Sequence, residues 1–430
     1  MRYALIVLLA AIPITVQARD LALQDALRLA EAHSFALKRA EAVRETARSG
    51  LRAARSDRLP VLSATAQGSY VSFVPEVEFG PLPAQELGTH DNYQADLRLS
   101  LPLYTGGRIA GGVGAAGATV DLYDALAAAD HDRLAYMTRA EYLTLLRTDR
   151  MLGIAHASLT RAQTVSRDAH SLYDAGAADS VALLEAELAL TRVTFAISQA
   201  ENARRASELR LLTYLGLDPA ETLTLTDSLS QPSEQSWESA VDSAKPEIAA
   251  ANATLGIRRW RWRASKSDFL PALSAMGGYS YGKPNLDRFN NTWNDYFTVG
   301  ATLTWSFNLG GKSVYNRQAA FHDLEAARLD REQTIENLSR DARLAVEQLK
   351  LSAARYTSAE AETRIARDNF RLASVQHRNG TLTSNRLITI EADLTTAEGS
   401  LAAALIDYHI ALSAYYYAVG SDLLQKGDEL

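Results

Sequence analysis

The stretch Leu-Pro-Leu-Tyr-Thr-Gly-Gly-Arg at residues 101–108 decides the fold, because a second stretch of the same design, Trp-Ser-Phe-Asn-Leu-Gly-Gly-Lys, stands at residues 305–312. The two Gly-Gly pairs are 204 positions apart, and the same offset separates further matching residues. These pairs are Gly176 and Gly380, Leu183 and Leu387, Glu187 and Glu391, Leu190 and Leu394, and Gly216 and Gly420. A constant offset over about 110 residues indicates an internal duplication.

Upstream of these stretches the offset changes, which locates an insertion in the first copy. Residues 56–63 (Ser-Asp-Arg-Leu-Pro-Val-Leu-Ser) match residues 267–274 (Ser-Asp-Phe-Leu-Pro-Ala-Leu-Ser) at an offset of 211, so the first copy carries seven extra residues before Gly106. Insertions collect in exposed loops, and we expect one here. The sequence predicts a first repeat over 19–216, a linking segment over 217–235, a second repeat over 236–420 and a tail over 421–430.

Each copy contains two stretches in which apolar and polar residues alternate, as in a strand with one apolar face. The odd-numbered positions of 93–103 are Tyr, Ala, Leu, Leu, Leu and Leu, whereas the even-numbered positions of 92–100 are Asn, Gln, Asp, Arg and Ser. We predict β-hairpins at about 61–104 and 272–308. Runs of about 10–12 residues suit tilted strands that cross a membrane, but the edge of a soluble β-sandwich shows the same alternation.

Four strands are too few to close a barrel. An open sheet edge does not persist in hydrocarbon, where no water satisfies its backbone groups. If these strands enter a membrane, several chains must therefore share one barrel. Two, three or four chains would supply eight, twelve or sixteen strands.

Long helices follow each hairpin. Residues 108–173 and 312–377 contain no proline and predict helices of about 100 Å each. A second helix is expected after each glycine that follows them, at 180–215 and 384–419, and shorter helices at 22–56 and 236–267 open the copies. Such helices need lateral packing, which a hollow helical cylinder or a plain coiled-coil stalk would provide.

Composition and the N-terminus exclude several classes. The chain has 430 residues, a formal charge of −7 and no cysteine, which argues against nucleic-acid binding and removes thiol chemistry, Cys-based metal sites and a lipid-anchoring Cys. Residues 1–18 fit a secretory signal peptide cleaved after Ala18. Beyond residue 18 the sequence contains no uninterrupted run of about 18 apolar residues, so it predicts no transmembrane helix.

These features together resemble the TolC-like outer-membrane efflux protein family, over about residues 21–420. The resemblance implies a mainly helical protein with membrane strands, in which four strands per chain contribute to a 12-stranded trimeric β-barrel that continues into a long periplasmic α-helical barrel. It implies an outer-membrane exit channel of a tripartite efflux system, with a homotrimer, a periplasmic adaptor protein, an inner-membrane transporter and outer-membrane lipid as partners. No enzymatic activity, cofactor, metal or nucleic acid is expected.

The resemblance also implies site residues. The turns between the long helices would dock the adaptor. Their residues are Gly176, Ala177, Asp179 and Ser180 in the first copy, and Gly380, Thr381, Leu382 and Ser384 in the second. Some relatives carry acidic pore rings where this chain has Arg386 and Thr389. We therefore expect a gate in which Arg386 pairs with Glu185 or Asp179 of a neighbouring helix.

Two further motifs have competing interpretations. The run Arg-Arg-Trp-Arg-Trp-Arg at 258–263 predicts membrane-interface anchors at Trp260 and Trp262, or else a solvated helix face. Residues 112–117 match a nucleotide-binding glycine pattern, but a lone match is weak, and we interpret these glycines as a closely packed helix start. Other functions that fit the pattern are a duct for metal-ion efflux or type I protein secretion, and a non-transporting coiled-coil spacer or adhesin.

Overall fold

The computed structural model describes residues 19–78, 80–81, 85–86, 88–176, 179–232, 236–286 and 291–421, so the predicted signal peptide and nearly all of the predicted tail lie outside the described residues. The chain divides into two compact units. We call them the helical unit, which comprises the described parts of residues 1–39, 128–245 and 335–430, and the strand unit, residues 40–127 and 246–334. Each sequence repeat contributes to both units, so the units are not the two repeats.

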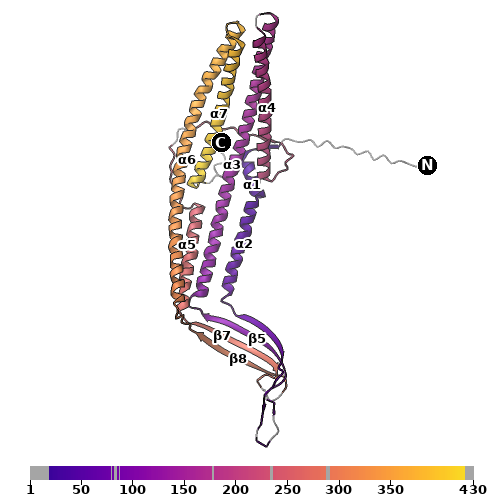
Figure 1. The fold of residues 1–430 in the computed structure, drawn as a ribbon. Coiled ribbons are helices and arrows are strands. Elements are labelled where there is room, and N and C mark those ends of the chain that lie inside the picture. Colours follow the sequence, from indigo (N-terminus) through magenta and orange to yellow (C-terminus); the bar gives the residue numbers. More distant parts are fainter. Residues whose placement is uncertain are drawn as a thin grey trace, which may run out of the picture. The chain divides into compact units, whose positions relative to one another are not determined.

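The strand unit contains a four-stranded antiparallel sheet in the order β2-β5-β7-β8 (Figure 1). Its strands are β2 (Val61–Tyr70), β5 (Asp91–Tyr104), β7 (Ala272–Lys283) and β8 (Asn294–Thr304). Both expected hairpins are present, and β5 pairs with β7 to join the two repeats. The loop of the first hairpin contains a short pair of strands, β3 (Glu76–Val77) and β4 (Gln85–Glu86), in the region where the inserted residues were expected.

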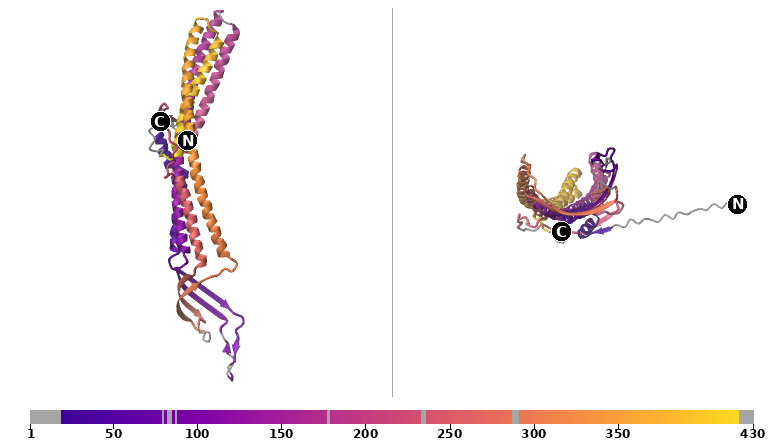
Figure 2. Two further views of the ribbon diagram at one scale, coloured as in Figure 1. Left: turned by 90° about the vertical axis from the view of Figure 1, so that its left-hand side faces the viewer. Right: turned by 90° about the horizontal axis from the view of Figure 1, so that it is seen from below.

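Helices continue from the strand ends at one end of this sheet (Figure 2). They are α2 (Phe35–Ser56), the start of α3 (Arg108–Asp174), α5 (Pro246–Ala264) with the 3₁₀ helix η1 (Ser265–Phe269), and the start of α6 (Lys312–Arg378). A Cβ on Gly114 would lie 2.3 Å from the Trp260 ring, and one on Gly111 would lie 2.5 Å from the Cβ of Ala264. Glycines at the start of α3 therefore permit its close approach to α5.

The helical unit contains α1 (Leu23–His33), the remainder of α3, α4 (Ser180–Leu215), the remainder of α6, and α7 (Ser384–Val419). Two three-residue strands, β1 (Arg19–Leu21) and β6 (Leu223–Leu225), pair in parallel. Its core gathers leucines from α1, α4 and both strands around Tyr142. The Tyr142 hydroxyl donates to Asp227 Oδ2 at 2.5 Å and contacts the Leu21 carbonyl oxygen at 3.0 Å, which ties β1 to α3.

Three elements differ from the sequence predictions. The helix expected over 22–56 is interrupted at Ser34, whose hydroxyl accepts from the Leu37 amide at 3.3 Å and so caps a new helix. The helix expected over 236–267 begins only at Pro246, because proline fits the first turn of a helix and not its interior. The linking segment contains β6, which was not expected.

Candidate functional site: the exposed sheet face and the helix tips

One face of the four-stranded sheet is apolar and exposed. Cross-strand neighbours on this face are Leu62 with Leu99, Leu97 with Tyr279, and Tyr279 with Phe297. Phe297 is 80% exposed and its same-face neighbour Val299 is 82% exposed. An apolar surface that runs across every strand without a covering layer marks an interface with a membrane or a protein.

The opposite face is polar. One row across the sheet contains Thr65, Asp96, Ser280 and Tyr296 in register. Within this face, the Gln94 amide donates to Asp96 Oδ1 at 3.0 Å and to the Ser280 hydroxyl at 3.3 Å. The sheet thus separates an apolar environment from a polar one, as lipid-facing and lumen-facing residues do in membrane strands.

Both edges of the sheet lack a neighbouring strand among the described residues, since β2 and β8 each pair on one side only. The unpaired backbone groups of an edge strand attract another strand. An exposed apolar face with two open edges is therefore complementary to further copies of the same sheet.

Aromatic side chains surround the junctions between strands and helices. Trp305 and Phe307, which follow β8, are 55% and 70% exposed, and the Trp305 indole donates to the Phe269 carbonyl at 3.2 Å. Trp260 and Trp262, the residues predicted as anchors, are half-buried between helices. Trp305 and Phe307 present more surface; the end of the second alternating run was the sequence signal that could have identified them.

The first helix tip joins α3 to α4. Gly176 has φ +66°, a left-handed conformation that glycine adopts without strain. Asp179 caps α4 by accepting from the Ala182 amide at 2.9 Å. Gly176, Asp179 and Ser180 are exposed, and Ala177 lies outside the described residues.

Val181 and Leu184 on α4, one turn beyond the tip, are 58% and 62% exposed. Their helical spacing could have identified them from the sequence.

The second helix tip joins α6 to α7. Gly380 has φ +73°, and Gly380 and Thr381 are exposed. Ser384 is buried, and Leu382 packs against the apolar cluster around Leu387. Leu382 and Ser384 therefore hold the turn together and present little surface to a partner.

The predicted gate residues lie close to both tips. Glu185 accepts a hydrogen bond from the Asn385 side chain at 3.2 Å, which links α4 to α7. Within the described protomer, Arg386 forms no ion pair with Glu185 or Asp179. Pairing of Arg386 across subunits stays a prediction.

Buried charged groups stabilise the helical unit away from the tips. Burial alone would raise the pKa of Glu208, but the Leu223 amide, the Arg205 hydrogen bond and the positive charges of Arg204 and Arg205 outweigh it and lower the pKa. For His409, in contrast, burial is the main cause, and it lowers the pKa because it disfavours the charged ring. His409 Nε2 contacts the Ser230 carbonyl oxygen at 2.9 Å.

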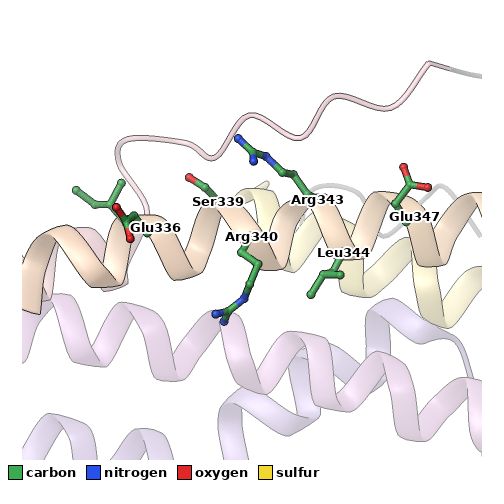
Figure 3. Close-up of a pocket in the computed structure, with 7 residues that line it drawn as sticks. Glu336, Ser339, Arg340, Arg343, Leu344 and Glu347 are labelled. Carbon is green, nitrogen blue, oxygen red and sulfur yellow. The ribbon is translucent and has the colours of Figure 1, made fainter.

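Two cavities lie in the helical unit. A cavity of about 460 Å³ is lined by one helix alone, residues 335–347 of α6, and Figure 3 shows Arg343 and Glu347 pointing to one side of that helix and Arg340 to the other. A cavity of about 640 Å³ has a mixed lining that includes Asp149, Arg150, Arg367 and Glu398, and Arg367 pairs with Glu398 at 3.4 Å. In the described part of the chain, no three His, Asp or Glu side chains gather as metal ligands.

Within the described ranges, none of the helices combines the length and apolar character needed to cross a bilayer. The same fold occurs in solved outer-membrane proteins, two of which are described as channels. VceC of Vibrio cholerae superposes with a TM-score of 0.79 at 17% identity, covering 93% of this chain and 96% of VceC. CmeC of Campylobacter jejuni gives 0.79 at 16% identity, with 95% and 88% covered. MtrE of Neisseria gonorrhoeae, in its open state, gives 0.69 at 19% identity, with 93% and 89% covered.

The chain therefore shares the fold of these solved outer-membrane proteins. The family model described as outer membrane efflux protein matches residues 26–217 and 239–421, and the chain belongs to this family. A comparison with curated proteins finds no significant match.

Proposed function

We propose that this chain is the exit channel of a tripartite efflux system, through which substrates delivered by an inner-membrane transporter and a periplasmic adaptor leave across the outer membrane. The observation that carries the proposal is the four-stranded sheet with one exposed apolar face, one polar face and two open edges. A lone sheet of this kind is unstable in lipid, because its edges have no hydrogen-bond partners there.

Closure by identical copies fits the strand directions. The order β2-β5-β7-β8 alternates in direction, so β8 of one copy would lie antiparallel to β2 of the next. Three copies would give twelve strands, the number that family resemblance favours, with the apolar face outward and the polar face lining the lumen.

The absence of cysteine provides a clean test of this assembly. Cysteine pairs introduced into the two edge strands, such as Ala64→Cys with Ala301→Cys and neighbouring registers, should form disulfides between subunits. A non-reducing gel of detergent-purified protein should then show dimers and trimers, and single-cysteine chains should show no trimer. A series of bands that ends at dimers or extends to tetramers would reject the trimer. Purified protein that shows no conductance in planar bilayers would favour the non-transporting coiled-coil spacer instead of a channel.

The helix tips are the proposed adaptor-docking surface. Exposed Gly176, Asp179, Ser180, Gly380 and Thr381, together with the apolar stripe that begins at Val181, support this role. Leu184→Arg should abolish efflux in cells while leaving channel conductance in bilayers unchanged. Loss of both activities would indicate a folding defect, and loss of neither would reject docking at this tip.

The proposed gate is tested at Arg386. If Arg386 holds the tips closed by pairing with an acidic residue of a neighbouring subunit, Arg386→Ala should raise the open probability of single channels. An unchanged closed state would remove Arg386 from the gate.

A further inference from the structure

Every strand joins a helix at the same end of the sheet, because β2 and β7 begin at that end and β5 and β8 finish there. These junctions are residues 57–60, 105–108, 261–271 and 305–317. Together they carry seven Arg and Lys against two Asp, whereas the whole chain has 44 basic and 51 acidic residues. The junctions therefore concentrate positive charge in an acidic protein.

Six of these basic side chains are exposed, and we call them the cation collar. They are Arg58, Arg108, Arg261, Arg263, Lys266 and Lys312. Within the described residues, no collar side chain has an ion-pair partner. The junctions contain two carboxylates, those of Asp57 and Asp268. The Asp268 carboxylate accepts a hydrogen bond from the Asn316 side chain at 3.4 Å. The positive charge of the collar is thus left for a partner outside the protomer.

Half-buried indoles hold part of the collar in place. The Arg263 guanidinium lies 4.9 Å from the centre of the Trp260 ring, and Lys266 Nζ lies 6.0 Å from that of Trp262. Arg317, the seventh cation of the junctions, lies 5.3 Å from the centre of the Trp262 ring. Cation–π contacts of this kind stabilise a charge against a ring while its polar hydrogens face water. Arg263 and Lys266 are therefore positioned groups rather than freely moving ones.

Exposed aromatic and apolar side chains accompany the collar. Trp305, Phe307 and Leu309 are 55%, 70% and 99% exposed at the end of β8. From the sheet to the helices, the chain thus passes from the apolar sheet face through exposed Trp305 and Phe307 to the cations of the collar. A bilayer presents hydrocarbon, interface and phosphate in the same order.

We propose that the cation collar binds the phosphate groups of anionic phospholipids, such as phosphatidylglycerol, in the headgroup layer beside the sheet. This inference rests on the proposed function, since it requires the sheet to lie in the membrane. A basic residue near an anionic membrane surface strengthens association by about fivefold. A lipid headgroup beside one collar cation should accordingly be preferred over a zwitterionic one by up to about that factor.

Tryptophan fluorescence measures this preference, because two of the five tryptophans (Trp262 and Trp305) lie in the junctions and a third, Trp260, directly precedes one of them. The full chain is reconstituted into vesicles that contain brominated phosphatidylglycerol or brominated phosphatidylcholine, and the quenching gives their relative association constant. We expect a constant above one for the anionic lipid in the wild type, decreasing toward one at high salt. The variant R261Q/R263Q/K266Q should lower it to about one, whereas R261K/R263K should retain it.

The matched control removes the same charge elsewhere. Arg192, Arg343 and Arg364 are exposed on helices of the helical unit, and R192Q/R343Q/R364Q should keep the wild-type preference. Equal quenching by both lipids in the wild type, or equal constants for the collar and control variants, would overturn the inference and leave the proposed function standing. No quenching by either lipid would instead reject the membrane location of the sheet.

A second arm separates lipid from free phosphate. Thermal unfolding in lipid-free detergent is compared with inorganic phosphate and with chloride at equal ionic strength. A stabilisation by phosphate that disappears in R261Q/R263Q/K266Q would assign the collar to a free anion and overturn the lipid proposal. An equal unfolding temperature in the two salts supports it.

Discussion

The duplication supplies its own control for a buried carboxylate in the helical unit. Glu391 on α7 is 8% exposed, and its Oε1 accepts from Ser158 Oγ at 2.9 Å, Arg161 Nε at 2.9 Å and Thr395 Oγ1 at 2.8 Å. Its counterpart Glu187 on α4 is 47% exposed, and within the described residues its carboxylate pairs only with the His170 ring, at 3.3 Å. The same residue type at the same repeat position thus has two environments.

The stability cost of Glu391→Ala depends on Arg161, the ion-pair partner that the substitution leaves in place. Removing one partner of a buried ion pair costs about 3–5 kcal/mol, but Arg161 is 18% exposed and keeps Glu398 at 3.3 Å. We therefore expect a smaller cost, about 2–3 kcal/mol, for Glu391→Ala, because this second carboxylate remains beside Arg161. An exposed pair contributes about 0–1 kcal/mol, so Glu187→Ala should cost little.

Hydrogen exchange measures both costs locally, without requiring reversible unfolding of a membrane protein. A difference of about 2 kcal/mol corresponds to roughly 30-fold faster exchange in the first turns of α7 in Glu391→Ala than in those of α4 in Glu187→Ala, each relative to wild type. Arg161→Ala combined with Glu391→Ala should cost less than the two single changes added. Equal acceleration in the two helices would show that the hydrogen bonds to Glu391 contribute nothing beyond an exposed pair.

Three further changes have defined outcomes. Gly114→Ala should destabilise the protein by about 1–3 kcal/mol in thermal unfolding, because its Cβ would collide with a tryptophan ring, whereas Gly117→Ala, with nothing within 4 Å, should stabilise it by up to about 1 kcal/mol. Tyr142→Phe should cost about 1.5–3 kcal/mol by removing a hydrogen bond to a carboxylate, measured by denaturant unfolding, and a cost near zero would contradict the tie between β1 and α3. Because the pKa of His409 is lowered in the folded state, its contribution to stability is complete above the ordinary value of 6.5 and decreases as pH falls below it. His409→Asn should flatten that dependence, and an unchanged pH profile would exclude His409 as its source.

The long helices were predictable because their boundaries are written locally. The sequence predicted helices over 108–173 and 312–377, and the structure ends them at Asp174 and Arg378. No proline interrupts either run, and a glycine two residues beyond each end supplies the left-handed conformation that stops a helix. The sheet was predictable for a similar reason, since alternation over 10–12 residues specifies which face is apolar.

The short parallel strands were not predictable, because no local pattern specifies three residues. β1 and β6 lie about 200 residues apart in the chain, and a hydrogen bond from the Leu23 amide to Asp227 at 2.7 Å joins their ends. The burial of Ser384 and the packing of Leu382 were also missed, because both residues belong to a turn in sequence, whereas Ser384 is buried and Leu382 contacts the apolar cluster around Leu387. Such features depend on tertiary contacts that no single segment encodes.

The two repeats also differ where a partner would be required. On α4, Val181, Leu184, Leu188 and Phe195 recur at helical spacing and are 58%, 62%, 50% and 65% exposed. At the same repeat positions α7 carries Asn385, Ile388, Ala392 and Gly399, which are smaller, polar or partly covered. An apolar stripe that its own protomer leaves uncovered is unfavourable in water unless another surface buries it. The α4 stripe and the open sheet edges lie in different units, and each lacks a partner within one chain. Identical copies would cover the sheet edges, whereas the proposed adaptor would cover the stripe.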